Sequence, residues 1–217
     1  KIITELKKLK SKGFKRIILA GSLIRPSISE IRPDINTIKL IPKFSKILFA
    51  GGDNNLLKFV ISELENLGFK NLKLFNVLPE CFLGNGNQTN IKIPKLIFDD
   101  IEKGKKILKV NSQFDIGQSI IIQNGTVIGI EASQGTDNLI KGSFKFLKKG
   151  QDAVLVKLLK VRQDLRADLP AIGIRTVKNC KKFSINGIAY SSNRTIFINK
   201  DDVMKFCRDN KIFLYGI

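Results

Sequence analysis

Apolar positions in the first third of the chain alternate between helical and extended spacing. Residues 2–12 and 54–67 repeat apolar side chains at the spacing of one helix face. Residues 16–23, 46–50 and 72–77 are short apolar runs typical of buried strands. Because strands that alternate with helices build βαβ units, the pattern predicts part of a Rossmann-like parallel sheet.

The rest of the chain mixes both patterns without an internal repeat. Asn124-Gly125 separates two strand-like runs, at 119–123 and 126–132, and is a strong hairpin signal. A helix is expected to start near Thr136. The other expected elements are helices at 95–110 and 201–209, strands at 154–157 and 212–215, and a second hairpin from 185–190 and 195–198.

Prolines and glycines interrupt residues 81–95 and their borders, which indicates a linker. The sequence therefore predicts an α/β protein with two domains. Residues 1–80 form a partial Rossmann-like domain, and residues 96–217 form a catalytic domain of mixed α+β structure.

Composition narrows the chemistry. The chain has no histidine, which excludes Ser-His-Asp triads, Cys-His dyads and histidine-bound metals. Its three cysteines are scattered without a C-x-x-C pair, which disfavours zinc fingers and suits a reducing cytosol. Any metal should therefore be a hard cation held by oxygens, Mg²⁺ or Mn²⁺.

The formal net charge of +19 attracts polyanions, such as nucleic acid, anionic membrane surfaces or phosphorylated substrates. Abundant Lys, Ile, Asn and Phe are also what an AT-rich genome gives, and this explains most of the charge. No signal sequence and no bilayer-spanning apolar run is found. We expect a cytoplasmic protein that lacks its natural N-terminus.

The acidic stretch at residues 163–168 is the first candidate for catalysis. Pro170 disfavours a helix before it, and in an extended stretch Asp164, Arg166 and Asp168 would share one face. Two carboxylates beside a cation can hold a metal, orient a water and neutralise a phosphate. Without further support, a solvated edge strand with a local salt bridge explains the same pattern.

A second candidate follows the predicted hairpin. Gly135-Thr136 appears where a strand leads into a helix, so a backbone N–H and a hydroxyl could hold a phosphate there. Thr136 could equally be a plain N-cap and Asp137 a first-turn acid. Asp115 and Gln118 form a third candidate, which ordinary turn chemistry also explains.

Glycines at expected strand ends in the first third form a fourth, weaker candidate. Gly21 precedes Arg25, and Gly52-Asp53 leads into a helix, which is where nucleotides bind in parallel sheets. Lys157 and Lys160, near the acidic stretch, are expected to contact phosphate or solvent.

Taken together, these motifs resemble the LpxI-type UDP-2,3-diacylglucosamine diphosphatase family, from Lys1 to the C-terminus. They occur in this order: Ala20-Gly21-x-x-x-Arg25-Pro26, Gly52-Asp53-x-x-Leu56-Leu57, Asp115-x-Gly117-Gln118, Glu131-Ala132-x-x-Gly135-Thr136-Asp137, and Lys157-x-x-Lys160-x-x-Gln163-Asp164-x-Arg166-x-Asp168-x-Pro170-x-Ile172-Gly173-x-x-Thr176.

The resemblance implies a Mg²⁺-dependent hydrolase of lipid A biosynthesis in a Gram-negative bacterium. It would cleave UDP-2,3-diacylglucosamine, held between two domains, into UMP and 2,3-diacylglucosamine 1-phosphate (lipid X). It also implies a peripheral contact with the cytoplasmic face of the inner membrane and no specific nucleic-acid partner, and it leaves a homodimer open.

On this basis we expect catalysis by Asp164, Asp168 and Arg166. The expected ligands of Mg²⁺, with Mn²⁺ as the alternative, are Asp137, Asp164 and Asp168. The expected substrate-binding residues are Gly21, Arg25, Gly52, Asp53, Asp115, Gln118, Gly135, Thr136, Lys157, Lys160 and Gln163.

The chain also departs from the family pattern. Gln134, Asn54 and Val161 stand where the family has Glu, Asp and Pro, and the family's opening strand and Gly-rich loop are not found before Lys1. The changes at Asn54 and Gln134 leave open a nucleotide-sugar-binding protein without catalysis. The net charge of +19 leaves open a second rival, a basic nucleic-acid-binding protein.

Overall fold

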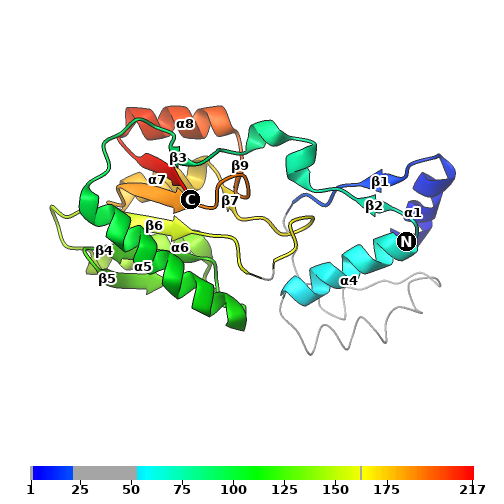
Figure 1. Ribbon diagram of the computed structural model, residues 1–217, viewed down its shortest axis with the longest axis horizontal. Helices are drawn as coiled ribbons and strands as arrows, with labels where there is room; N and C mark the ends of the chain where they lie inside the picture. Colours follow the sequence, from blue (N-terminus) through cyan, green and yellow to red (C-terminus); the bar gives the residue numbers. More distant parts are fainter. Residues whose placement is uncertain (1, 22–52, 162) are drawn as a thin grey trace. The chain divides into compact units, whose positions relative to one another are not determined.

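The computed structural model describes residues 2–21, 53–161 and 163–217, which fold as α/β structure with a mixed sheet. The chain divides into two compact units (Figure 1). We call residues 1–77 with 164–168 the N-terminal unit, and residues 78–163 with 169–217 the C-terminal unit. None of the helices in the described ranges is long and apolar enough to cross a membrane.

The described part of the N-terminal unit contains two α-helices, one strand pair and a short 3-10 helix. Helices α1 (Ile2–Ser11) and α4 (Asp53–Asn66) occupy predicted positions. Strands β1 (Arg16–Ile17) and β2 (Lys70–Asn71) pair in parallel. On α4, the positions predicted to be apolar include the buried Leu56, Ile61 and Leu64. The strand predicted at 46–50 lies outside the described residues.

The strand predicted at 72–77 is wrong. After the amide of Leu72 donates to the carbonyl of Ile17, pairing stops, because the described β1 ends there. The chain then forms the short 3-10 helices η2 (Leu74–Asn76) and η3 (Pro79–Cys81). Apolar spacing alone does not show that a strand lacks a partner.

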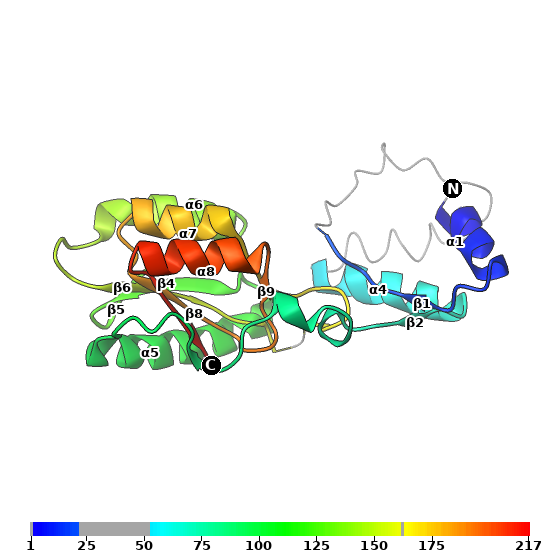
Figure 2. The same cartoon turned by 90° about the horizontal axis from the view of Figure 1, so that it is seen from above.

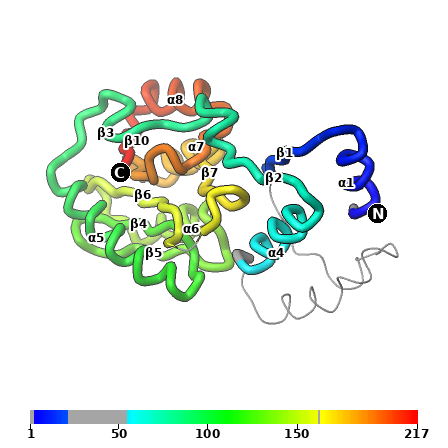
Figure 3. Tube along the Cα trace, turned by 45° about the vertical axis from the view of Figure 1, so that its right-hand side comes forward, coloured from blue at the N-terminus to red at the C-terminus, as the bar shows by residue number. Residues whose placement is uncertain are grey.

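The C-terminal unit is built on a six-stranded sheet of order β3-β10-β8-β6-β4-β5. Strands β6, β8 and β10 are parallel to one another, whereas β3 pairs antiparallel with β10, β4 with β6, and β5 with β4. Figure 3 traces β3 beside β10 and β4 beside β5. The strands are β3 (Gly86–Asn87), β4 (Ser119–Gln123), β5 (Thr126–Ile130), β6 (Ala153–Lys157), β8 (Gly187–Tyr190) and β10 (Phe213–Gly216).

Helices cover both faces of this sheet (Figure 2). Helix α5 (Lys95–Asn111), continued by η4 (Ser112–Phe114), packs on one face. Helices α6 (Gly135–Ser143), α7 (Ile174–Lys182) and α8 (Lys200–Asp209) pack on the other. The side chains of β6 alternate between the two cores: Val154 and Val156 face α5, and Leu155 faces the three helices.

The first predicted hairpin is confirmed as β4 and β5, but the second is wrong. Strand β8 already pairs with β6 on one side and β10 on the other, so no edge is left for residues 195–198. Instead β9 (Ile196–Phe197) pairs in parallel with β7 (Ala171–Ile172). Strand β3 lies inside the predicted linker, and helix α7 was not predicted.

Candidate functional site

Four polar side chains meet at one end of the sheet in the C-terminal unit. Strands β6 and β8 end there at Lys157 and Tyr190, and β4 begins there at Ser119, opposite Lys157. Glu131 follows β5, and its amide donates to the carbonyl of Ser119 at 2.8 Å. Thr136 lies in the first turn of α6. Carboxyl ends of parallel strands are where α/β folds bind ligands, so this is a suitable place for a site.

We call Ser119, Glu131, Thr136 and Lys157 the Lys157 cluster. The Lys157 ammonium donates to Thr136 Oγ1 at 2.6 Å and to Ser119 Oγ at 3.4 Å. Thr136 in turn donates its hydroxyl proton to Glu131 Oε1 at 2.7 Å. A hydroxyl has one proton, so Thr136 cannot donate to a phosphate while it holds Glu131. Its role in this arrangement is to orient the ammonium.

Both charges of the cluster are buried: Lys157 is 4% exposed and Glu131 is 7% exposed. Burial alone would raise the pKa of Glu131. The charge of Lys157 and hydrogen bonds from Ser119, Thr136 and the amide of Gln118 outweigh it and hold this pKa below its ordinary value. The cluster is therefore an ionised carboxylate that keeps a buried ammonium in place.

The loop before β4 passes very close to this carboxylate. Gly117 has φ +27, and a Cβ there would lie 2.0 Å from the carbonyl oxygen of Glu131. Only glycine permits that approach, which lets the amide of Gln118 donate to Glu131 Oε2 at 3.1 Å. The Gly117-Gln118 motif therefore joins the loop to the Lys157 cluster.

Replacing Gly117 by Ala should lower the free energy of unfolding by about 3 kcal/mol or more, because the methyl group overlaps backbone atoms that cannot move aside. Gly125→Ala is the matched control, since Gly125 also has positive φ but open space at its Cβ. It should cost about 1 kcal/mol. Equal losses in urea denaturation would show that backbone strain, not the contact with Glu131, requires Gly117.

A second polar group lies beside the cluster. Lys160 pairs with Asp115 at 2.6 Å, and its amide donates to Gln163 Oε1 at 2.9 Å. Among the described residues, Gln118 Oε1 and Gln163 Nε2 are buried without a hydrogen-bond partner. Buried polar atoms without partners are costly, so these two amides are candidates for contact with a ligand. The C-terminal unit thus brings together six predicted substrate-binding residues: Asp115, Gln118, Thr136, Lys157, Lys160 and Gln163.

The start of α6 holds two further predicted residues. Gly135 has φ +75, and its amide donates to the carbonyl of Ala132 at 3.3 Å. Asp137 pairs with the exposed Arg175 of α7 at 2.6 Å. The Gly135 amide already has a partner, so a phosphate would have to replace that contact. The Asp137 carboxylate accepts from Arg175 and from Thr176 Oγ1, and among the described residues its remaining lone pairs stay available to a metal.

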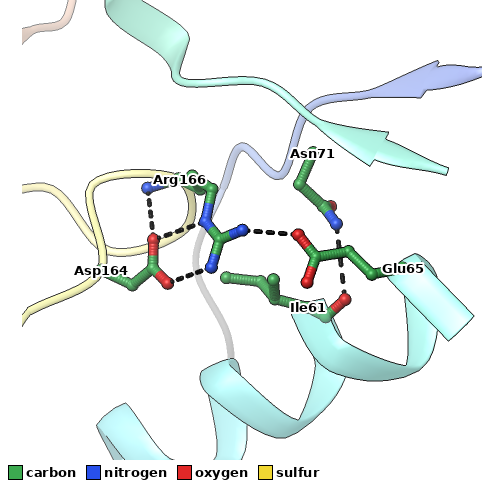
Figure 4. Close-up of polar contacts among 5 residues, drawn as sticks. All are labelled: Ile61, Glu65, Asn71, Asp164 and Arg166. Atoms are coloured by element: carbon green, nitrogen blue, oxygen red, sulfur yellow. Dashed lines mark hydrogen bonds and ion pairs between the residues drawn. The ribbon is translucent and has the colours of Figure 1, made fainter.

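The acidic stretch is not extended, and that part of the prediction is wrong. Residues 164–168 form a turn in which the amides of Ala167 and Asp168 both donate to the carbonyl of Asp164. The turn belongs to the N-terminal unit (Figure 4). Pro170 does disfavour a regular helix, but it does not prevent a single tight turn.

Arg166 holds the side chain of Asp164 with a planar fork. Its Nε and Nη2 donate to the two carboxylate oxygens at 3.0 and 2.8 Å, and its Nη1 reaches Glu65 of α4 at 2.6 Å (Figure 4). The same figure shows Asn71 of β2 donating to the carbonyl of Ile61 on α4. Hydrogen bonds from Arg166, opposed by burial and aided by the charges of Arg166 and Lys58, hold the pKa of Asp164 below its ordinary value.

The carboxylates of the predicted metal ligands have the donor chemistry that Mg²⁺ requires. Carboxylate oxygens are the ligands that this ion prefers. Among the described residues, Asp164 Oδ2 accepts one bond, from Arg166, so a lone pair stays available for a metal. Within the same residues no three acidic or cysteine side chains gather where they could hold a metal. Asp137 belongs to the C-terminal unit and Asp164 and Asp168 to the N-terminal unit, so their joint binding stays a prediction.

Four predicted residues lie at the edge of the described structure or outside it. Gly21, with φ +120, is described, whereas Arg25 and Gly52 are not. Asp53 begins α4, but its side chain is outside the described part.

Two members of the Lys157 cluster were missed as site residues. The sequence pattern places Glu131 in a family motif without assigning it a role, and it predicts Ser119 only as a residue of a strand. A signal for Glu131 is present in the sequence: it is an acidic residue directly after an apolar strand and shortly before the start of a helix. Ser119 carries no comparable signal, since its role depends on pairing with Lys157 across the sheet.

Comparison with known proteins places the chain. The LpxI N-terminal domain matches residues 1–81, and the LpxI C-terminal domain matches residues 84–215. A protein of Caulobacter vibrioides named UDP-2,3-diacylglucosamine pyrophosphatase LpxI is 27% identical over 97% of this chain and 77% of its own length. Because the two domain descriptions together match nearly the whole sequence in the expected order, the chain belongs to the LpxI family.

Proposed function

We propose that this protein hydrolyses the diphosphate of UDP-2,3-diacylglucosamine to UMP and 2,3-diacylglucosamine 1-phosphate (lipid X), as a step of lipid A biosynthesis. The observation that carries the proposal is the match to both LpxI domains, together with the pyrophosphatase name of the similar Caulobacter protein. Water adds to one phosphorus, the bond to the bridging oxygen breaks, and two phosphate monoesters leave.

The C-terminal unit supplies positive charge for the diphosphate in this proposal. Lys157 is oriented by Thr136 beside the carboxylate of Glu131, so its ammonium is already positioned to meet the phosphate oxygens. Lys160 either leaves its ion pair with Asp115 to bind phosphate, or keeps that pair and is oriented by it toward the phosphate. The buried amides of Gln118 and Gln163 bind polar groups of the nucleotide sugar. Gly135 lies at the start of α6, where a helix favours an anion.

The N-terminal unit supplies the acidic turn. Asp164 acts as the essential carboxylate, which orients the attacking water and accepts its proton, with Asp168 beside it in the chain. Arg166 takes up negative charge that develops on the phosphate oxygens. Gly21, Arg25, Gly52 and Asp53 contact the uridine nucleotide, in a domain that we propose to be Rossmann-like.

Mg²⁺ completes the proposal, with Mn²⁺ as its alternative. Asp164, Asp168 and Asp137 would hold it through carboxylate oxygens. When bound, the ion would neutralise negative charge on the diphosphate and would make a water molecule easier to deprotonate. This help matters because the chain has no histidine to act as a base. The enzyme is proposed to work in the cytoplasm, where it takes a lipid substrate from the inner membrane.

The direct test is UMP release from UDP-2,3-diacylglucosamine by the full-length protein. We expect equal amounts of UMP and lipid X with Mg²⁺, a loss of turnover after EDTA treatment, and recovery when Mg²⁺ is added back. Turnover that persists in EDTA would contradict the metal requirement but not the proposed hydrolysis. Tight product binding without hydrolysis would favour a nucleotide-sugar-binding protein, and salt-dependent DNA binding without UMP release would favour a nucleic-acid-binding one.

A further inference from the structure

A basic and aromatic turn lies between α6 and β6 in the C-terminal unit (Figure 2). The 3-10 helix η5 (Phe144–Phe146) forms it, and Leu147 anchors it by packing against the core of α6, α7 and α8. Phe144 is 48% exposed and Phe146 is 60% exposed. Lys145, Lys148 and Lys149 are exposed beside them.

Neighbouring segments add to this turn. A hollow of about 710 Å³ opens at the end of the sheet where β6, β8 and β10 begin, the opposite end from Lys157. Its described lining includes five lysines and one acid, Asp152. We call the three lysines and two phenylalanines of the turn, with Lys181 and Lys211, the Lys-Phe patch.

Ordinary helix electrostatics explains only part of this patch. Lys181 lies in the last turn of α7, where a cation is favoured, and it donates to the carbonyl of Asn210 at 3.2 Å. Lys148 and Lys149 follow η5 and complete no helix end. Phe144 contacts the ring of Phe183, yet it and Phe146 still leave about half of their surface in water. Such exposed apolar surface is unfavourable unless another surface covers it.

The chemistry of the patch fits an anionic bilayer better than a nucleic acid. Bases bind aromatic side chains by stacking on ring faces. Here Lys145 Nζ lies 4.9 Å from the ring centre of Phe146, and the ring of Phe183 packs against that of Phe144 with centroids 5.7 Å apart. These contacts take up ring face on which a base would stack, whereas the exposed parts of both side chains can enter the boundary between lipid headgroups and acyl chains.

We propose that the Lys-Phe patch docks the C-terminal unit onto anionic phospholipid, with Phe144 and Phe146 inserted and the lysines on lipid phosphates. Each lysine close to an anionic lipid surface strengthens binding several-fold. The phenylalanines add an apolar contribution to the binding free energy, which salt does not screen. The proposal rests on this surface and does not require the reaction proposed above.

Vesicle flotation of the full-length protein tests the proposal. The probes are vesicles of phosphatidylcholine alone and of phosphatidylcholine with phosphatidylglycerol. The variant Lys145→Gln/Lys148→Gln/Lys149→Gln should bind the anionic vesicles about tenfold more weakly or worse. The matched control, Lys95→Gln/Lys106→Gln/Lys109→Gln on α5, removes as many exposed charges and should lose less than about twofold.

A second pair of variants tests the apolar part. Phe146→Ser should remove the binding that survives high salt, whereas Phe114→Ser, at a residue that is 70% exposed on η4, should not. Equal losses in the patch and control variants would overturn the proposal in favour of total charge. So would a loss of binding to duplex DNA, but not to vesicles, in the patch variant. UMP release from detergent-dispersed substrate should be normal in the patch variants, which separates this proposal from the catalytic one.

Discussion

Replacing Asp164 by Asn should lower the rate of UMP release by about 100-fold or more at saturating substrate, with little change in folding. The side chain keeps its size but loses the charge that holds the Arg166 fork and, in our proposal, accepts a proton from water. Its amide nitrogen is a donor, so it cannot accept from Arg166 as Asp164 Oδ2 does at 2.8 Å. Turnover with Mg²⁺ and a thermal melt check both parts.

Glu65→Gln is the matched control. Glu65 binds the same guanidinium from α4 at 2.6 Å, but its side chain is 46% exposed, so the pair is worth little. Turnover should change by less than about twofold. If Asp164→Asn turned over at a near-normal rate, or if Glu65→Gln lost as much as Asp164→Asn, the carboxylate of Asp164 would not be the catalytic one.

The acidic turn shows what local sequence can and cannot predict. The residue types led to a site prediction, because carboxylates are among the few groups left for proton transfer in a chain without histidine. The ion pair of Asp164 with Arg166 is also what a plain local salt bridge gives, so the site stays a prediction. The geometry was not predictable from the stretch alone. Arg166 is held by Glu65, which lies far away in the sequence, and this contact belongs to the tertiary fold.

The same distinction applies to the sheet. The hairpin of β4 and β5 was predictable because Asn124-Gly125 is itself the turn, with φ +46 and +74. Residues 185–198 gave a similar local signal, with a positive φ at Asn193. Yet β8 pairs with β6, where Gly187 lies opposite Val154, and with β10, where Gly187 lies opposite Phe213. Both partners are parallel, so each is reached by a crossover connection and not by a hairpin turn. A hairpin turn can be predicted from the residues of the turn itself. Which strand pairs with which cannot, because that depends on all the strands of the sheet.

The Lys157 cluster follows from both kinds of information. A lysine at the end of an apolar strand could be read from the sequence, and so could a threonine at the start of a helix. What could not be read is that Glu131 and Ser119 complete the group. Strand pairing sets Ser119 opposite Lys157, and Gly117 brings the preceding loop onto Glu131. The two buried charges therefore lie together because of the strand pairing and the loop path, and not because of a local sequence pattern.

Replacing Glu131 by Gln should lower the free energy of unfolding by about 3 kcal/mol or more at neutral pH, because it leaves the ammonium of Lys157 buried without this carboxylate. The amide keeps the shape of the side chain, so the loss reports the charge. Urea denaturation measures it. A loss below about 1 kcal/mol would show that Glu131 does not hold Lys157 in place.

The pH dependence and a double variant separate charge from packing. The pKa of Glu131 is below its ordinary value of 4.5 in the folded chain, so its stabilising effect is present above that pH and is lost as pH falls through the folded pKa. The loss of stability with acid should therefore be shallower in Glu131→Gln than in the parent. Glu131→Gln/Lys157→Met removes both charges and should recover stability relative to the single variant. Its UMP release should still be low, because the ammonium that we assign to the diphosphate is gone. Recovery of both stability and turnover would contradict that assignment of Lys157.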